Sequence, residues 1–191
     1  MQITRPEAAA YILEKSRDSI RKKGGCVIAI DGNSGAGKST FAMRLAAASG
    51  AALFHMDDFF LPPELRTPER LEKPGGNIHS ERFLEEIIQG ISSGKDFIYH
   101  VFSCNDFSYT EKKAFYAPVN IIEGVYSMHP AWQDRLDLKV FMQIAPEVQQ
   151  ERILHRNGEE MLKKFTDRWI PMENRYFDFC KIREICDCIV V

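Results

Sequence analysis

The residues from Gly32 to Thr40 are the part of the sequence whose types and spacing point most directly to chemistry. The spacing Gly32-x-x-x-x-Gly37-Lys38-Ser39 matches the phosphate-binding pattern G-x-x-x-x-G-K-[ST] at every position. Glycines let successive N–H groups turn toward an anion, the lysine adds a point charge at the phosphate oxygens, and the serine hydroxyl can ligate Mg²⁺. The pattern predicts that a nucleoside triphosphate binds to Gly32, Asn33, Ser34, Gly35, Ala36, Gly37, Lys38, Ser39 and Thr40.

The elements around this pattern are those that a phosphate-binding loop requires. An apolar run over Cys26–Ile30 precedes it and is typical of a strand buried on both faces of a parallel sheet. A helical stretch over Phe41–Ala48 follows it. Strand, glycine-rich turn and helix in this order favour a phosphate cradle over a glycine-rich turn with an incidental lysine.

Two carboxylate positions follow further apolar runs. Asp57 and Asp58 lie just past the expected strand Ala52–His55, and Glu123 lies just past Val119–Ile122. Ligands of such sheets bind at the carboxyl ends of the strands. We expect Asp57 to accept a proton from an attacking hydroxyl, and Asp57, Glu123 and Ser39 to hold Mg²⁺. The alternatives are a loop-capping pair and a carboxylate at a surface strand end.

Arg152 and Arg156 are spaced four residues apart on an expected helix and therefore share one face of it. Arginines in this place could clamp the migrating phosphoryl group. A solvated basic stripe is the alternative interpretation, and it is the commoner meaning of such a charge pattern.

Strands that alternate with helices predict an α/β fold in three layers, with a mainly parallel sheet flanked by helices. Residues 1–191 are expected to form a single domain with lid-like segments at about 61–79 and 156–168. Phe97–Phe102 and Lys113–Tyr116 could form a β-hairpin-like excursion. Further strands are expected at Leu138–Ile144 and Ile189–Val191. Four further helices are expected: one after Thr4, one from Ser80 to a stop at Gly90, one from Pro146 to a break at Asn157-Gly158, and one over 159–179.

Composition narrows the range of partners. The net charge of −2 gives no general attraction to nucleic acid or to an anionic membrane. The five cysteines lack zinc spacing, and no apolar run approaches the roughly 20 residues of a membrane span. No signal peptide is visible, so a cytoplasmic protein is expected. A homo-oligomer stays open.

At this point the sequence resembles the uridine kinase and phosphoribulokinase branch of P-loop kinases. The matching stretches occur in the family's order at Ile30–Thr40, His55–Phe60, Gly75–Phe83, Ile122–Val125 and Glu151–Arg156. The resemblance implies a kinase that uses ATP and Mg²⁺. By position it implies that Asp57 is the catalytic base, that Phe60 is an aromatic of the substrate pocket, and that Glu123 helps to hold Mg²⁺. It also implies that Arg152 and Arg156 contact phosphate or substrate.

The sequence departs from that family where the acceptor would bind. His79 stands at the position of an acidic residue that binds ribose hydroxyls, and of the segment expected to meet uracil only Phe102 fits. A nucleoside is therefore the first expectation, with His79 and Phe102 as substrate contacts. Another small alcohol or a sugar phosphate is the alternative, for which Arg66 and Arg70 could bind an anionic group. A non-catalytic ATP-binding regulatory protein is the alternative outside the enzymes, and no Asn-Lys-x-Asp motif supports a GTPase.

Overall fold

The strand before the phosphate-binding pattern lies inside a six-stranded sheet. The computed structural model describes residues 1–191, and all the strand pairs of this sheet are parallel, in the order β1-β8-β7-β2-β6-β3. Their bounds are β1 (Gln2–Ile3), β2 (Cys26–Gly32), β3 (Ala52–His55), β6 (Val119–Glu123), β7 (Leu138–Met142) and β8 (Cys188–Val190). The predicted α/β class with a mainly parallel sheet is confirmed.

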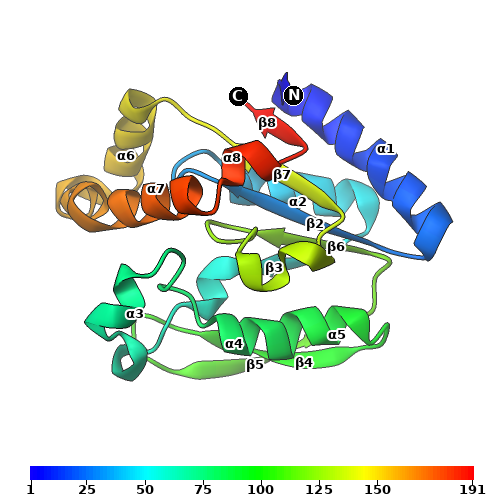
Figure 1. The fold of residues 1–191 in the computed structure, drawn as a ribbon, viewed down its shortest axis with the longest axis horizontal. Coiled ribbons are helices and arrows are strands. Elements are labelled where there is room, and N and C mark those ends of the chain that lie inside the picture. The colour runs from blue at the N-terminus through cyan, green and yellow to red at the C-terminus, as the bar shows by residue number, and fades with distance from the viewer.

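The apolar runs become central strands because helices cover both faces of the sheet. On one face lie α1 (Arg5–Lys23) and α2 (Lys38–Ser49), whose apolar side chains pack with those of β2, β6 and β7 (Figure 1). The backbone N–H and hydroxyl of Thr4 both donate to Glu7, so α1 begins at the capping box that the sequence predicts.

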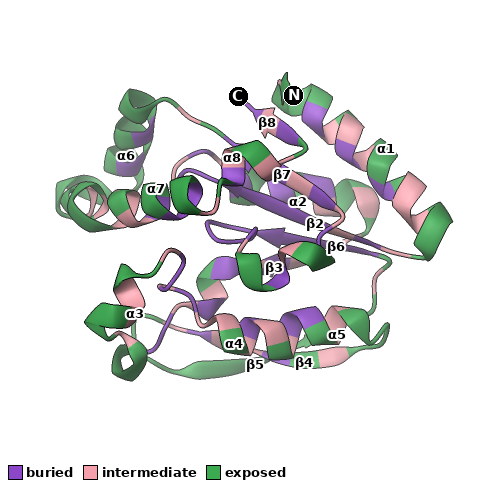
Figure 2. Cartoon of the chain, in the orientation of Figure 1, coloured by how far each residue is buried: buried purple, intermediate pink, exposed green.

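The opposite face carries the larger apolar cluster. It is covered by α4 (Ser80–Phe83), the π-helical η3 (Leu84–Ile88), α5 (Gln89–Ser92), α7 (Ile170–Phe179) and α8 (Ile182–Ile185). Figure 2 shows that burial is concentrated in the sheet and on the inner faces of these helices. Together with the sheet they make the three layers.

Two expectations about the α4–α5 helix were wrong. The residue that caps it is His79 instead of Ser80, and the helix passes through Gly90 to Ser92. Gly90 is needed inside the helix, because a Cβ there would lie 2.5 Å from the ring of Phe97. Packing of a strand against the helix therefore explains this glycine, which the sequence alone presents as a stop signal.

The excursion is an antiparallel hairpin of β4 (Phe97–Phe102) and β5 (Tyr109–Ala114). The hairpin was predicted, but its second strand begins earlier than the expected Lys113–Tyr116. Five of the six β5 residues are exposed, so this strand lacks the apolar alternation that marks a strand with one buried face.

The connections on the ligand side contain short elements. They are η1 (Met56–Phe59), η2 (Pro63–Leu65), α3 (Pro68–Glu72), η4 (Pro130–Arg135) and the π-helical η5 (Phe165–Trp169). The long helix α6 (Pro146–Lys164) precedes η5. Gly158 leaves helical geometry at φ 80°, where Asn157-Gly158 predicts a break. No helix combines the length and apolar composition that crossing a membrane requires, and all the cysteines are free thiols.

Candidate active site

The phosphate-binding pattern forms the turn between β2 and α2. Gly32 has φ 136°, and a Cβ on it would lie 2.1 Å from the carbonyl oxygen of Met142 in the neighbouring strand. The Lys38 side chain is buried and folds back over the turn, where its Nζ donates to the carbonyls of Gly32 (2.9 Å) and Asn33 (3.0 Å). The ammonium group is therefore already positioned at the loop in the free protein.

The carbonyl oxygens of the loop are held from outside. Gln149 of α6 donates to Ser34, and Arg5 of α1 donates to Ala36, at 2.9 and 2.7 Å. Several N–H groups remain without any protein acceptor; these belong to Gly35, Gly37, Lys38, Ser39 and Thr40. N–H groups that converge at the start of a helix form an anion site, since the helix dipole adds to their partial charges.

Asp31, the residue just before the loop, joins it to the neighbouring strands. Its fully buried carboxylate accepts N–H bonds from Gly32 (2.8 Å), Tyr126 (3.3 Å) and Met128 (3.0 Å), and a hydroxyl bond from Tyr176 (2.8 Å). Burial raises the pKa of Asp31 to about 6, while these donors act in the opposite direction. The group fixes the loop's position between β6 and α7.

Register brings two carboxylate-bearing segments to the same edge of the sheet. His55 at the end of β3 lies opposite Glu123 at the end of β6, and their Nδ1 and Oε1 atoms are 2.6 Å apart. The bond to Glu123 raises the pKa of His55. Asp57 follows in η1 and has no hydrogen-bond partner. The positive charge of Lys38 lowers the pKa of Asp57, and the negative charge of Glu123 raises it.

Asp57 is solvent-accessible in the free protein, yet it lies among many protein atoms at the end of the sheet. Their exclusion of water raises the pKa of Asp57, and nearby Lys38 partly offsets this. A carboxylate with a raised pKa accepts a proton more readily than an ordinary aspartate. Lys38 and Glu123 are both near enough to affect the pKa of Asp57. The shared role of the three residues in a reaction stays a prediction.

The donor set suits a magnesium ion that keeps several of its waters. Asp57 has both oxygens free, and no bond occupies the hydroxyl of Ser39, which is exposed in the first turn of α2. One Glu123 oxygen bonds His55, which leaves the other available. No cluster of three or more His, Cys, Asp or Glu side chains forms a dedicated metal cage. Mg²⁺ typically takes one or two carboxylates together with substrate phosphates and water, so these residues fit it.

The two arginines of α6 occupy different surroundings. Arg152 reaches the loop, where its Nη1 donates to the carbonyl of Gly35 at 3.1 Å. Arg156 is exposed and bonds its neighbour Asn157 at 2.7 Å. The structure therefore brings Arg152 to the phosphate loop and leaves Arg156 on the exposed surface of α6, so that its contact with phosphate remains a prediction.

The expected acceptor residues lie beside η1. Phe60 forms a bridge with Ile78, and His79 caps α4 with its buried Nδ1 unpaired. Phe102 is 3% exposed and packs against Phe107 and Tyr109 in the hairpin. Their contact with a substrate is still a prediction.

Two more polar atoms in this region lack partners. They are Oδ2 of Asp58 and Nε of Arg82, both buried. Arg82 lies over the ring of Phe59 and donates to the carbonyls of His100 and Asp58. Burial raises the pKa of Asp58, whose nearest cation is Lys112 at 3.9 Å.

Several site residues were not found from the sequence. The loop and the Asp31 before it are bonded from helices distant in sequence by Arg5, Gln149, Glu173 and Tyr176. In addition, His55 of one strand bonds Glu123 of the next. Only Asp31 carried a local signal, as an acidic residue between an apolar strand and the glycine pattern.

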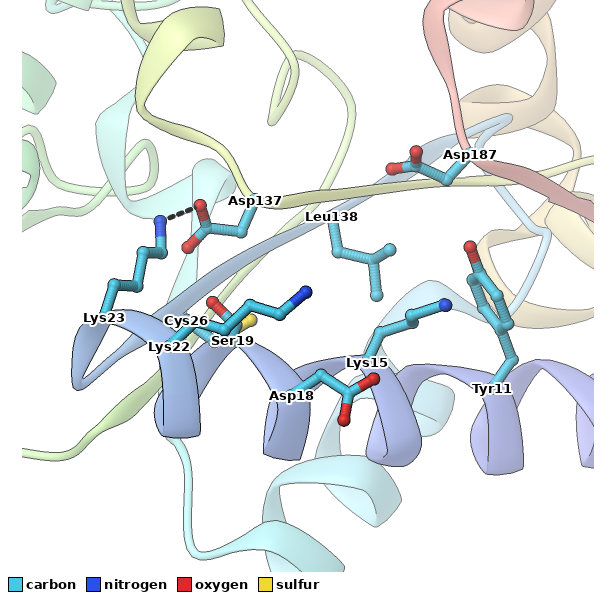
Figure 3. Close-up of a pocket in the computed structure, with 10 residues that line it drawn as sticks. All are labelled: Tyr11, Lys15, Asp18, Ser19, Lys22, Lys23, Cys26, Asp137, Leu138 and Asp187. Atoms are coloured by element: carbon cyan, nitrogen blue, oxygen red, sulfur yellow. Dashed lines mark hydrogen bonds and ion pairs between the residues drawn. The ribbon is translucent and has the colours of Figure 1, made fainter.

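A cavity of about 410 Å³ lies away from this site (Figure 3). Side chains of α1 from Tyr11 to Lys23 line it together with Cys26, Asp137, Leu138 and Asp187, at the amino ends of β2 and β7. None of the predicted site residues lines it. The candidate active site lies at the opposite, carboxyl ends of these strands.

Comparison with known proteins agrees with the geometry at the level of fold. No family model and no curated protein matches the chain. A possible uridine kinase from Bacillus stearothermophilus superposes with a TM-score of 0.73 at 17% identity, over 97% of this chain and 98% of that one. A provisionally named fructose transport system kinase from Silicibacter sp. TM1040 gives 0.73 at 21%, over 98% of each chain. TT1252 from Thermus thermophilus gives 0.51 at 18%, over 86% and 87%. The chain therefore has the fold of the first two proteins, both of which are named as kinases.

Proposed function

We propose that the protein is an ATP-dependent kinase that transfers the γ-phosphate to a hydroxyl group of a small molecule. The observation that carries this proposal is the set of unpaired N–H groups in the loop, with Lys38 folded over the same turn. These groups belong to Gly35, Gly37, Lys38, Ser39 and Thr40. An anion site of this kind, with an unbonded carboxylate of Asp57 at the same edge of the sheet, has the parts that phosphoryl transfer requires.

In the proposed reaction the acceptor oxygen forms a bond to the γ-phosphorus while the bond to the β–γ bridging oxygen breaks. Asp57 takes the hydroxyl proton, and ADP leaves. Lys38 and the loop N–H groups neutralise the charge that develops on the phosphate oxygens. Two arginines add to this neutralisation: Arg156 from the lid segment 156–168, and Arg152 from the part of α6 just before it.

Ser39, Asp57 and Glu123, the last two partly through water, would hold Mg²⁺. When bound, the ion supplies positive charge to the β and γ phosphate oxygens and orients them. The bond between Glu123 and His55 keeps the carboxylate at the carboxyl end of β6. One continuous domain, residues 1–191, would supply the whole site.

A nucleoside is the first candidate acceptor, with Phe60, His79 and Phe102 as its contacts. His79 favours keeping a second candidate, another small alcohol or sugar, because a neutral histidine cannot accept two hydroxyl hydrogen bonds as a carboxylate does. An anionic acceptor held by Arg66 and Arg70 has weaker support. Arg70 already bonds Glu81 at 2.7 and 2.8 Å, and Arg66 bonds the carbonyl of Leu61 at 2.7 Å.

The test is incubation with γ-labelled ATP and a pool of nucleosides, sugars and small alcohols, followed by mass analysis of labelled products. We expect one labelled phosphomonoester with the unaltered protein and none with Asp57→Asn, which should still bind ATP. A product formed equally by the variant would remove Asp57 from the role of base. ATP binding without any labelled acceptor would support the regulatory alternative.

A further inference from the structure

Glu173 places a buried carboxylate on the phosphate loop itself. It comes from α7, is 5% exposed, and accepts the N–H of Ser34 at 3.1 Å through Oε2. Its Oε1 accepts the Ser34 hydroxyl. The backbone N–H and the hydroxyl of one loop residue are therefore both bonded to a carboxylate from a helix that is distant in sequence.

This contact is part of a wider attachment of one helical arm to the loop. The arm consists of α6, η5 and α7, residues 146–179. Gln149 near its start donates to the Ser34 carbonyl at 2.9 Å, so both the N–H and the carbonyl of Ser34 are bonded to the arm. Tyr176, one helical turn beyond Glu173, donates to Asp31 at 2.8 Å. The position of the arm is thus coupled to the conformation of the loop.

The attachment depends on the same positive charge that a nucleotide needs. Burial raises the pKa of Glu173, and among the groups that act in the opposite direction Lys38 has the largest effect, ahead of the bonds from Ser34. In loops of this type the lysine contacts the β and γ phosphates. A triphosphate would bring a second anion beside Lys38, close to the carboxylate of Glu173, which has little contact with water that could screen the repulsion. A diphosphate lacks the γ-phosphate and therefore adds less negative charge there.

We propose that Glu173 is a latch that holds the helical arm on the phosphate loop in the free protein and is displaced by a triphosphate but not by a diphosphate. This inference rests on the proposed function, because it takes the loop to be the nucleotide site. It assigns to Glu173 a positioning role and makes the arm's contact with Ser34 sensitive to the γ-phosphate.

The variant Glu173→Gln tests the charge while retaining a side chain of the same shape. Its matched control is Glu14→Gln, an exposed glutamate of α1 that also loses one charge. Affinities for ADP and for an ATP analogue with a β–γ imido bridge are measured by calorimetry. We expect Glu173→Gln to increase the preference for the triphosphate over ADP about fivefold or more, at the low end of typical coupling effects. An unchanged preference would overturn the latch.

A second measurement uses the unaltered protein and does not depend on a variant folding. Trp169 lies one turn before Glu173, while the only other tryptophan, Trp132, is fully buried. We expect the ATP analogue, but not ADP, to change tryptophan emission. Equal spectra with both nucleotides would overturn the latch and leave the kinase proposal standing. If neither nucleotide binds the unaltered protein, the kinase proposal fails and the latch fails with it.

Discussion

At the scale of single residues, Lys38 is the side chain whose partners would change most when a nucleotide binds. Its bonds to the Gly32 and Asn33 carbonyls must give way, in part, to phosphate oxygens. A hydrogen bond to a charged group contributes about 1.5–3 kcal/mol. We therefore expect Lys38→Ala to weaken ATP binding roughly 10- to 100-fold and to lower turnover. Titration calorimetry and the labelled-ATP assay check this, with the exposed Lys163→Ala as control. Unchanged affinity would remove Lys38 from the cradle.

His129 gives a prediction about stability and pH. Its ring stacks on Trp132 at 4.9 Å, its Nδ1 accepts the N–H of Ala131, and burial lowers its pKa to about 4. The folded state therefore disfavours protonation of His129, whereas in the unfolded chain this histidine binds a proton below about pH 6.5. This contribution to stability is fully present above pH 6.5 and is lost as the pH falls toward 4, by at most about 3 kcal/mol.

Urea unfolding of the unaltered protein and His129→Phe between pH 4 and 7 measures this effect. Phenylalanine keeps the stacking on Trp132 but has no group that titrates. The variant should show a smaller loss of unfolding free energy on acidification. His155→Gln, at an exposed position of α6, should behave like the unaltered protein. Parallel pH profiles for all three proteins would contradict the assignment.

At the scale of elements, the junction of β2 with the phosphate loop depends on close approach of β7. A Cβ on Gly32 would lie 2.1 Å from the Met142 carbonyl oxygen, so Gly32→Ala must push the strands apart. We expect a loss of at least about 2 kcal/mol in unfolding free energy, because strain and a clash act together. Gly50→Ala is the control: Gly50 also has a positive φ, 67°, but open space around it. Equal losses, measured by denaturant unfolding, would show that the approach of β7 is unimportant.

The sequence predicts those elements whose signal is local. A continuous apolar run marks β2, three apolar residues among the first four mark β6, and the glycine spacing marks the loop with Lys38. The start of β5 could not be predicted, because an exposed two-stranded hairpin imposes no alternation on its residues. The bond of Glu173 to Ser34 spans 139 positions and exists only after α7 packs on the sheet. Contacts of this kind have no counterpart in local spacing, so they appear only in the folded chain.

At the scale of the whole molecule, nucleotide binding should stabilise the fold. A ligand at about 100 times its Kd adds about 2.7 kcal/mol to the unfolding free energy. For a domain of about 150–250 residues, each kcal/mol raises Tm by roughly 2–4 °C. We expect ATP with Mg²⁺ to raise Tm by about 5–11 °C, and EDTA to reverse much of the rise. Thermal unfolding followed by circular dichroism measures it, with Lys38→Ala as control. No shift at saturating ATP would contradict binding at the loop.

The parallel pairing of β1 with β8 has a consequence for how the chain reaches its fold. Gln2 and Ile3 lie opposite Ile189 and Val190, and β1 pairs with no other strand. Figure 1 shows the N-terminal end of the chain beside β8. During synthesis from the amino end, β1 must wait for its only partner until the rest of the domain has emerged. The edge of β7 that β8 covers also stays open until then. Contacts of such long range form slowly, so ribosome-bound chains would expose an unpaired strand edge at which neighbouring nascent chains can associate.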